Sequence, residues 1–538
     1  MDKKNIKLEK LINSFDIAIK NKELKKAKLY FEKIINIKKD IAGVYYNLGR
    51  LEIILENYKD SIRLFQKTLE INPNLPTALV NLGLAYSKSG NDKLAIDNYI
   101  QAINLDPKNY IAHFNLGSLY KKKADLKNSE KYLNNSIKIN PRILPAYNNL
   151  FELYDKSNQL DKLDALIKKI QTNFEESSIT DFYTGILKYK KKNYFDVIDI
   201  FERIKIDHKD LKRLTVKNEI LAKSYDFTGN YKKAYIFFEH ANDNIHKIYN
   251  NKFNKNIYLN FIKKRSEYFS DDNLKNWKSI NYTTKINDPI FLIGFPRSGT
   301  TLLDTILRSH PSIEVLEEEP IIDEVINNLE KIIKNDFSKL ENLDENLFNK
   351  IRKIYFEKRN QYINYNKNKI FIDKLPLNIV NVGEIARFFP NAKFILALRN
   401  PFDSVLSCFM QSFSLNHAMS NFLNIDDTAK LYDNVMSLWL SYSQNLSIKS
   451  HVVKYENVVK NFDKTIYDLI NFLELEWSDD VKNFNKTARK RGIVNTPSYD
   501  QVNIPLYTKS INRWKNYENN FSNVKHILNK WVKKFNYS

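Results

Sequence analysis

The chain has 538 residues, of which 85 are Lys or Arg and 63 are Asp or Glu, so its formal net charge at pH 7 is +22. This length is too great for one ordinary hydrophobic core, so two or more domains are expected. A positive charge favours anionic partners. Lysine is nevertheless spread along the whole sequence without a nucleic-acid-binding motif, so we expect no nucleic-acid partner.

The sequence offers few residues for disulfides or metals. The single cysteine, Cys408, excludes an internal disulfide, and the eight histidines form no HExxH pair. We therefore expect no metal. The N-terminus, MDKKNIKLEK, is not followed by an apolar stretch of signal-peptide length, and no apolar run of about 18 residues occurs. These features predict a cytoplasmic protein without a membrane span.

The N-terminal half repeats itself every 34 residues. This period resembles the tetratricopeptide repeat (TPR), a pair of antiparallel helices in which small residues allow close packing and a proline ends the second helix. The recurring residues are Leu48, Leu82, Leu116 and Leu150, then Gly49, Gly83 and Gly117, then Pro73, Pro107 and Pro141. The predicted units are 42–75, 76–109 and 110–143, with an atypical unit at 8–41 and weaker ones up to residue 243.

Three domains or segments are expected along the chain. Residues 1–243 should form an all-α solenoid, whose concave face commonly binds peptides or proteins. Residues 244–288 are polar and lysine-rich, and are expected to form a connecting helical segment. In residues 289–538, apolar runs alternate with helical patterns, as in a parallel sheet flanked by helices. The predicted strands are Ile290–Phe295, Ile370–Asp373, Lys393–Leu398 and Val452–Tyr455, and 320–368 is expected to be helical.

The segment Gly294 to Thr301, GFPRSGTT, follows the first of these apolar runs and opens an amphipathic helix. A glycine-rich turn at such a place directs backbone N–H groups and a helix dipole at one point, which suits a phosphate or sulfate. Its spacing matches the nucleotide-binding P-loop, GxxxxGK(S/T), except that Thr300 replaces the lysine. That lysine normally reaches the β and γ phosphates of ATP, so its absence argues against kinase or ATPase chemistry.

Five segments, in family order, resemble the motifs of sulfotransferases that use 3′-phosphoadenosine 5′-phosphosulfate (PAPS), and most closely the tyrosylprotein sulfotransferases. The resemblance covers residues 289–515. It implies a P-loop-like α/β sulfotransferase domain after the TPR solenoid, which moves a sulfuryl group from PAPS to a hydroxyl acceptor. The segments are PRSGTTLL (Pro296–Leu303), LEEEP (Leu316–Pro320), DKLP (Asp373–Pro376), FFPNAKFILALRNPFDSVLSCF (Phe388–Phe409) and SYDQVNIPLYTKSINRWKNY (Ser498–Tyr517).

Sulfuryl transfer requires aligned reactants and stabilisation of the charge that develops on the leaving phosphate, which side-chain cations can supply without a metal. Arg297 and Lys374 are the predicted catalytic cations. A general base must accept the proton of the acceptor hydroxyl. Glu317, Glu318 and Glu319 are crowded together, so mutual repulsion is expected to raise the pKa of one of them. The resemblance selects Glu318 as the catalytic base.

The resemblance also implies the donor-binding residues. The glycine-rich loop is expected to bind the 5′-phosphosulfate, and Arg399 and Ser407 the 3′-phosphate, because a guanidinium fork and a hydroxyl suit that group. Tyr455 matches a tyrosine near the family's donor pocket, and two further residues match its C-terminal closing loop. The predicted donor-binding residues are Pro296, Arg297, Ser298, Gly299, Thr300, Thr301, Arg399, Ser407, Tyr455, Ser498 and Arg513.

Three positions depart from the tyrosylprotein sulfotransferase pattern. Gln411 replaces an arginine that assists the 3′-phosphate, and Pro320 and Glu324 replace arginines that favour acidic peptides. The acceptor therefore stays open among a protein tyrosine, a saccharide and a small-molecule hydroxyl. The TPR solenoid is expected to recruit that acceptor or a partner protein.

Two other functions compete with this interpretation. A P-loop-type kinase or ATPase is disfavoured by the missing lysine and by the residues suited to a 3′-phosphate. A non-catalytic TPR scaffold, whose C-terminal half binds nucleotide without turnover, is disfavoured because the predicted catalytic residues are all present. Transfer of labelled sulfate would separate these alternatives.

Overall fold

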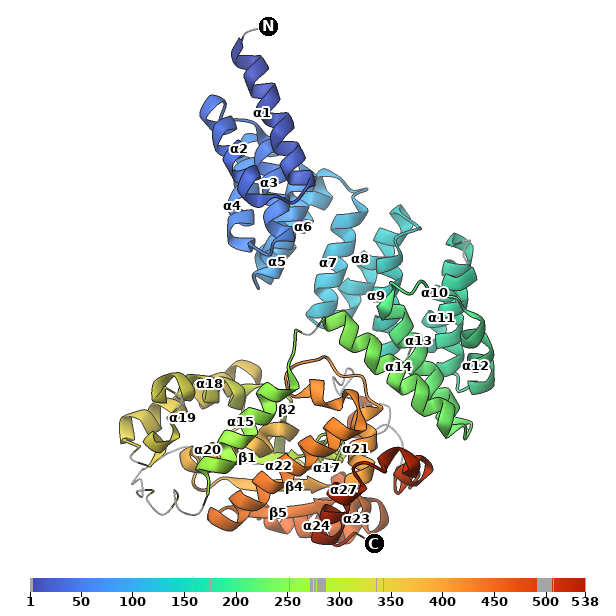
Figure 1. Cartoon of the computed structure of the whole chain (residues 1–538), viewed down its shortest axis with the longest axis vertical. Helices are drawn as coiled ribbons and strands as arrows, with labels where there is room; N and C mark the ends of the chain where they lie inside the picture. Colours follow the sequence, from blue (N-terminus) through green and yellow to red (C-terminus); the bar gives the residue numbers. More distant parts are fainter. Residues whose placement is uncertain are drawn as a thin grey trace. The chain divides into compact units, whose positions relative to one another are not determined.

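The computed structural model describes residues 3–157, 159–174, 177–250, 252–270, 274, 277, 287–334, 336–341, 343–490, 506 and 508–537. Internal contacts divide the chain into two compact units, Met1–Lys191 and Lys192–Ser538. The first unit is helical in its described residues, and the second adds a parallel sheet (Figure 1). The predicted fold class, helical repeats followed by an α/β domain with a parallel sheet, is confirmed.

Consecutive helices of the first unit pack in pairs. The pairs α3–α4, α5–α6 and α7–α8 coincide with the three clearest predicted repeats, and α1–α2 forms the atypical first one. The helices are α1 (Lys3–Lys20), α2 (Leu24–Ile37), α3 (Ala42–Ile54), α4 (Tyr58–Ile71), α5 (Pro76–Lys88), α6 (Asp92–Leu105), α7 (Tyr110–Lys122), α8 (Leu126–Ile139), α9 (Leu144–Lys156), α10 (Leu160–Asn173) and α11 (Ser177–Lys190).

Glycine allows the two helices of a repeat to approach closely. A Cβ atom on Gly83 would lie 2.7 Å from the ring of Tyr99, and one on Gly117 would lie 2.8 Å from the side chain of Leu133. Real Cβ atoms essentially never approach so closely, so a larger residue would force the helices apart. The small residues that recur in the sequence therefore have the packing role that the repeat pattern predicts.

The second unit contains a sheet of five parallel strands in the order β2-β3-β1-β4-β5. Four strands, β1, β3, β4 and β5, lie where the sequence predicts them, although β5 ends at Lys454 and does not include Tyr455. The edge strand β2 was not predicted, because its IEVLE sequence runs directly into a cluster of glutamates. The strands are β1 (Ile290–Gly294), β2 (Ile313–Glu317), β3 (Ile370–Lys374), β4 (Lys393–Leu398) and β5 (Lys449–Lys454).

Helices and short 3-10 turns connect and surround these strands. The predicted helical character of residues 320–368 is confirmed by α18, η1 and α19 as far as Tyr362, whereas residues 363–368 lie outside a helix. The elements are α12 (Tyr194–Arg203), α13 (Leu211–Phe227), α14 (Tyr231–Tyr249), α15 (Lys255–Tyr268), α17 (Thr300–Arg308), α18 (Ile321–Ile333), η1 (Phe337–Leu340), α19 (Glu345–Tyr362), η2 (Pro376–Asn381), α20 (Val382–Phe388), α21 (Pro401–Phe409), η3 (Met419–Leu423), α22 (Ile425–Asn445), α23 (Tyr455–Lys460), α24 (Phe462–Phe472), η4 (Asp479–Asn483), α25 (Phe484–Lys490), η5 (Arg513–Phe521) and α27 (Lys525–Lys534).

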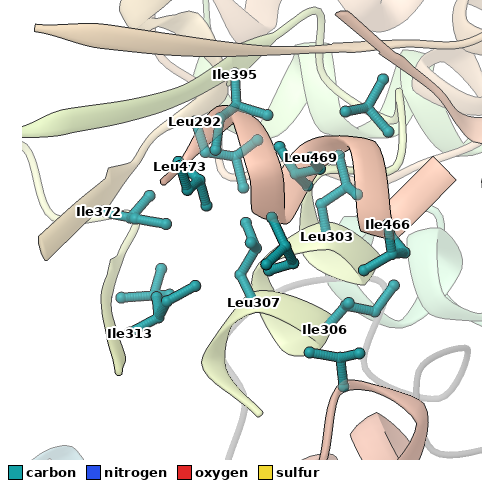
Figure 2. Packing of buried hydrophobic residues seen from close by; sticks show 14 of the residues in the cluster. Leu292, Leu303, Ile306, Leu307, Ile313, Ile372, Ile395, Ile466, Leu469 and Leu473 are labelled. Carbon is teal, nitrogen blue, oxygen red and sulfur yellow. The ribbon is translucent and has the colours of Figure 1, made fainter. Parts of the chain in front are cut away.

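Both faces of the central strands are covered. On one face, Leu292 of β1 packs in a cluster that includes Leu307 of α17 and Leu469 of α24 (Figure 2). On the other, Phe291 packs against Tyr355 of α19, with ring centroids 6.1 Å apart. Strands buried on both faces read as continuous apolar runs, which is why β1 could be recognised from the sequence. The same core fixes α17, whose N-terminus carries the glycine-rich loop.

The last helical pair, α13–α14, belongs to the same compact unit as the sheet. The side chain of Asn242 in α14 donates hydrogen bonds to the backbone oxygens of Phe409 and Leu423, both at 3.1 Å. The ring of Phe238 packs against Phe409 with centroids 6.2 Å apart. The two compact units thus meet after Lys191, whereas the sequence analysis places the end of the repeat domain at residue 243. The predicted domain limits stay a prediction.

Three observations concern membranes, metals and the single cysteine. Among the described helices, none is long and apolar enough to cross a membrane. In the described part of the chain, no three His, Cys, Asp or Glu side chains come together in a group that could hold a metal ion. The thiol of Cys408 is free of disulfides and buried in α21.

Candidate functional site

The glycine-rich loop turns sharply between β1 and α17. Gly299, which precedes the first helical residue, has φ of +94°, and Arg297 has φ of +67°. Both values lie in the left-handed region, which favours glycine and costs other residues conformational energy. A Cβ atom on Gly299 would also lie only 2.9 Å from the ring of Tyr455. Glycine is required at position 299 by both its backbone conformation and its surroundings.

The loop is packed tightly against the end of β4. Gly294 pairs with Ala397 in the sheet, and a Cβ atom on Gly294 would lie 2.6 Å from the backbone oxygen of Ala397. The thiol of Cys408 donates a hydrogen bond to the backbone oxygen of Pro296 at 3.3 Å. Ser298, Thr300 and Thr301 are all buried. These contacts fix the loop at the N-terminus of α17, where backbone N–H groups can bind an anion.

Arg297, Arg399 and Ser407 meet beside this loop. The Nε of Arg297 donates to Oγ of Ser407 at 3.0 Å, and a terminal nitrogen of Arg399 donates to the backbone oxygen of Arg297 at 3.2 Å. The Nε of Arg399 is buried and has no hydrogen-bond partner among the described residues. The residues predicted for the two ends of the donor therefore lie in direct contact, although they are about a hundred residues apart in the sequence.

The start of α21 is capped by the side chain of Asn400. The side-chain oxygen of Asn400 accepts a hydrogen bond from the backbone N–H of Phe402 at 3.0 Å, and Pro401 occupies the first turn. The backbone N–H of Asn400 donates to Glu456 at 2.9 Å. The guanidinium of Arg399 lies over the ring of Tyr455, 5.1 Å from its centroid. Tyr455 itself opens α23 and is not the last residue of a strand, as the sequence had suggested.

Glu318 and Lys374 are brought together by the pairing of β2 with β3. Glu317 lies opposite Lys374 in this register, and the backbone N–H of Glu318 donates to the backbone oxygen of Lys374 at 2.7 Å. The Nζ of Lys374 lies 2.7 Å from a carboxylate oxygen of Glu318 and 3.3 Å from one of Glu317. The Lys374 side chain is fully buried, whereas that of Glu318 is 36% exposed. A buried ammonium group, that of Lys374, and a partly exposed carboxylate, that of Glu318, therefore lie next to each other.

The structure corrects the electrostatic expectation for the three glutamates. Lys374 contacts both Glu317 and Glu318, so their charges are compensated by an ammonium group. The pKa of Glu319 is raised, and the cause is burial of its carboxyl group. Repulsion between neighbouring carboxylates is therefore not what sets the pKa of Glu319.

Asp373 is a buried acid that the sequence did not single out. Burial raises its pKa to about 7, a hydrogen bond from Tyr355 opposes that shift, and the charge of Asp323 adds to it. The Tyr355 hydroxyl donates to Oδ2 at 2.9 Å, while Oδ1 has no partner in the described part of the chain. Its place at the end of a buried strand, directly before Lys374, is the sequence signal that could have identified it.

The C-terminal segment approaches Arg399 and is held by buried acids. A terminal nitrogen of Arg399 donates to the backbone oxygen of Ser510 at 2.6 Å. Asp403, in the first turn of α21, accepts hydrogen bonds from the backbone N–H groups of Asn512 at 2.7 Å and Trp514 at 2.9 Å. Burial raises the pKa of Asp403, and the charge of Arg399 opposes that shift. The sequence analysis did not identify Asp403.

The sequence analysis assigns Ser498 and Arg513 to the C-terminal closing loop, and the structure describes only one of them. Ser498 lies outside the described residues. Arg513 is described, and its guanidinium is paired with the carboxylate of Asp226 in α13 at 2.6 Å. Its role in donor binding stays a prediction.

Every strand of the sheet places a predicted site residue at or just after its C-terminal end. In a parallel sheet these ends lie along one edge, which is where α/β proteins usually bind ligands. The parallel arrangement of the strands therefore brings the predicted site residues to one edge of the sheet. The residues are the loop 295–299 after β1, Glu318 after β2, Lys374 at the end of β3, Arg399 after β4 and Tyr455 after β5.

Comparisons with known proteins show similarity to a sulfotransferase family and to tetratricopeptide repeats. Residues 289–479 match the family model described as the sulfotransferase family. Residues 33–108 and 110–143 match two models of the tetratricopeptide repeat. The first match contains the loop, Glu318, Lys374, Arg399 and Tyr455.

The chain is 27% identical over 323 residues to an uncharacterized protein of Aquifex aeolicus, which covers 59% of this chain and 41% of that protein. It is 27% identical over 237 residues to protein-tyrosine sulfotransferase 1 of Danio rerio, covering 42% of this chain and 65% of the other. The chain thus spans less than two thirds of the length of these relatives. Among solved structures, the C-terminal part of a TPR repeat-containing protein from Cytophaga hutchinsonii is similar with a TM-score of 0.35 and 18% identity, covering 42% of this chain and 92% of that one.

The buried carboxyl of Asp373 predicts a pH dependence of stability. In an unfolded chain an aspartic acid ionises at about pH 3.9, whereas in the folded protein the pKa of Asp373 is about 7. Between these values the folded protein keeps a proton that the unfolded chain has lost, so this group makes the free energy of unfolding fall as pH rises. Asp373→Asn, which cannot ionise, should flatten the decrease in denaturant midpoint between pH 5 and pH 8. Identical slopes in variant and wild type would contradict this assignment.

Proposed function

We propose that this chain, in which a sulfotransferase-family domain follows tetratricopeptide repeats, transfers a sulfuryl group from PAPS to a hydroxyl acceptor. The observation that carries the proposal is the direct contact of Arg297 with Ser407 and Arg399 beside the glycine-rich loop. PAPS has anionic groups at both its 5′ and 3′ positions. A loop suited to one anion, joined to a second arginine and a serine, matches a nucleotide with two such ends.

The described residues fit this donor. The loop 295–299 and the N-terminus of α17 would hold the 5′ end, with Thr300 and Thr301 as hydroxyl donors. Arg399 and Ser407 would hold the 3′-phosphate. The Nε of Arg399 is buried and finds no acceptor in the described part of the chain, and a phosphate oxygen would satisfy such a donor. Tyr455, whose ring lies beneath Arg399, would fix the guanidinium from the other side.

The chain's own residues can supply the acid–base and electrostatic requirements of the transfer. When bound, PAPS supplies an electrophilic sulfuryl group attached to a phosphate leaving group. We assign the proton of the acceptor hydroxyl to Glu318, whose carboxylate is partly exposed. Lys374, which is buried, and Arg297, which is partly buried, would stabilise the negative charge that grows on the leaving oxygen, because cations fixed in place beforehand stabilise a developing charge.

The acceptor is proposed as a hydroxyl compound recruited with the help of the repeats. Glu324, which stands where the tyrosylprotein enzymes carry an arginine, is paired with Lys358 at 2.7 Å. This arrangement adds no free positive charge at position 324 and so does not favour an acidic peptide. A protein tyrosine, a saccharide and a small-molecule hydroxyl remain the candidate acceptors, and the TPR units would bind the acceptor or a partner protein.

One prediction of this proposal concerns recognition of the 3′-phosphate. Adenosine 3′,5′-bisphosphate should bind more tightly than ADP, and Arg399→Ala should abolish that preference. Loss of charge-assisted hydrogen bonds of about 1.5–3 kcal/mol corresponds to binding weakened by roughly 10- to 100-fold. Calorimetric titration measures both affinities. Arg203→Ala, which removes an exposed arginine from α12, is the matched control and should bind as wild type does. Equal affinity of the wild type for both nucleotides would count against the proposed donor.

Another prediction of the proposal concerns catalysis. Glu318→Gln should lower the transfer of labelled sulfate from PAPS to acceptors in a cell lysate by roughly 10²- to 10⁴-fold, the usual contribution of a general base. Glu357→Gln, at an exposed glutamate of α19, provides a control for loss of one negative charge. Unchanged transfer in Glu318→Gln would reject Glu318 as the base. No transfer by the wild type, together with magnesium-dependent ATP turnover, would reject a sulfotransferase in favour of an ATPase or kinase.

A further inference from the structure

The carboxylate of Asp226, near the end of α13, binds two residues of the C-terminal segment. One oxygen is paired with a terminal nitrogen of Arg513 at 2.6 Å, and the other accepts a hydrogen bond from the hydroxyl of Tyr517 at 2.6 Å. The Asp226 side chain is only 11% exposed, so both bonds are shielded from water. Tyr231 of α14 adds an edge-to-face contact with Tyr517, the ring centroids being 5.4 Å apart.

The segment held by Asp226 also contacts the proposed donor site. Ser510 accepts a hydrogen bond from Arg399, and the backbone N–H groups of Asn512 and Trp514 donate to Asp403 in the helix that follows Arg399. The Trp514 ring stacks on Phe402, with centroids 4.3 Å apart. One end of this short segment is thus anchored on α13, while the other end supports the arginine proposed for the 3′-phosphate.

Two more side chains of the pair α13–α14 hold the end of α21, which carries Ser407. Glu219 of α13 accepts a hydrogen bond from the hydroxyl of Ser412. Asn242 of α14 donates to the backbone oxygens of Phe409 and Leu423. Because α21 leaves its last carbonyl groups without partners inside the helix, the bond from Asn242 satisfies one that would otherwise be buried and unpaired.

We infer that the last helical pair, α13–α14, is a structural part of the donor site and that Asp226 is its principal positioning residue. Asp226 holds residues 510–517 in place and sets the orientation of the Arg513 side chain. The guanidinium of Arg513 has five N–H donors, so donors remain for a ligand after it pairs with one carboxylate. This inference rests on the proposed function for the identity of the donor. It extends that function by assigning part of the donor site to helices that precede the sheet domain in the sequence.

The test compares Asp226→Asn with Tyr517→Phe and with Asp199→Asn, a control at an exposed aspartate of α12. In the full-length protein without ligand, amide hydrogen exchange of residues 508–517 should be about tenfold faster in Asp226→Asn, because the ion pair to Arg513 is lost. Tyr517→Phe removes one of the two bonds and keeps the ion pair, so a smaller increase is expected. Asp199→Asn should exchange as wild type does.

The same variants then test the link to the donor. Adenosine 3′,5′-bisphosphate should bind about tenfold more weakly to Asp226→Asn, and KM for PAPS should rise while kcat stays within about twofold, as expected for a residue that acts on donor binding. Unchanged exchange in residues 508–517 would overturn the positioning role. Faster exchange with unchanged nucleotide affinity would overturn the assignment of α13–α14 to the donor site. If the wild type does not bind the nucleotide, the proposed donor is wrong, and the exchange comparison still decides whether Asp226 holds the segment.

Discussion

The pairing of β1 with β4 is the constraint on which the rest of the site depends. These strands are adjacent and parallel, with Gly294 opposite Ala397, so the loop after β1 and the helix after β4 emerge at the same edge of the sheet. The hydrogen bond from Arg297 to Ser407 then joins them directly. An anion-binding turn alone would suit many phosphates. Its contact with a second arginine and a serine is the feature on which we base the proposal of a ligand with two anionic groups.

The site also contains two strained residues that are not glycine. Arg297 and Glu318 both adopt left-handed backbone conformations, with φ of +67° and +53°. Such conformations cost about 1–2 kcal/mol each and persist only where the surrounding structure enforces them. Here the enforcing contacts are the bond from Arg399 to the backbone oxygen of Arg297 and the bond from the backbone N–H of Glu318 to Lys374. Two of the three residues proposed to act on the reacting groups, Arg297 and Glu318, therefore have backbones held in place by contacts within the chain.

Local sequence patterns were sufficient for the repeats, four of the five strands and the glycine-rich loop, because each depends on residues close together in the chain. The strand β2 was missed because its short sequence, IEVLE, contains two glutamates and continues into two more, so it resembles a solvated loop until it pairs with β3. The roles of Asp403 and Asp226 could not be predicted either. Asp403 binds residues 109 and 111 positions away, and Asp226 binds residues 287 and 291 positions away, so only the folded chain shows those contacts.

The most direct test of the central claim, that one pocket binds both ends of a bisphosphorylated adenine nucleotide, is a crystal structure of the full chain with adenosine 3′,5′-bisphosphate. The account predicts that the 5′-phosphate lies on the backbone N–H groups of the loop 295–299 and the start of α17. The 3′-phosphate should contact Arg399 and Ser407 in the same molecule. A nucleotide bound at another edge of the sheet, or one that contacts the loop while its 3′-phosphate points away from Arg399, would contradict it.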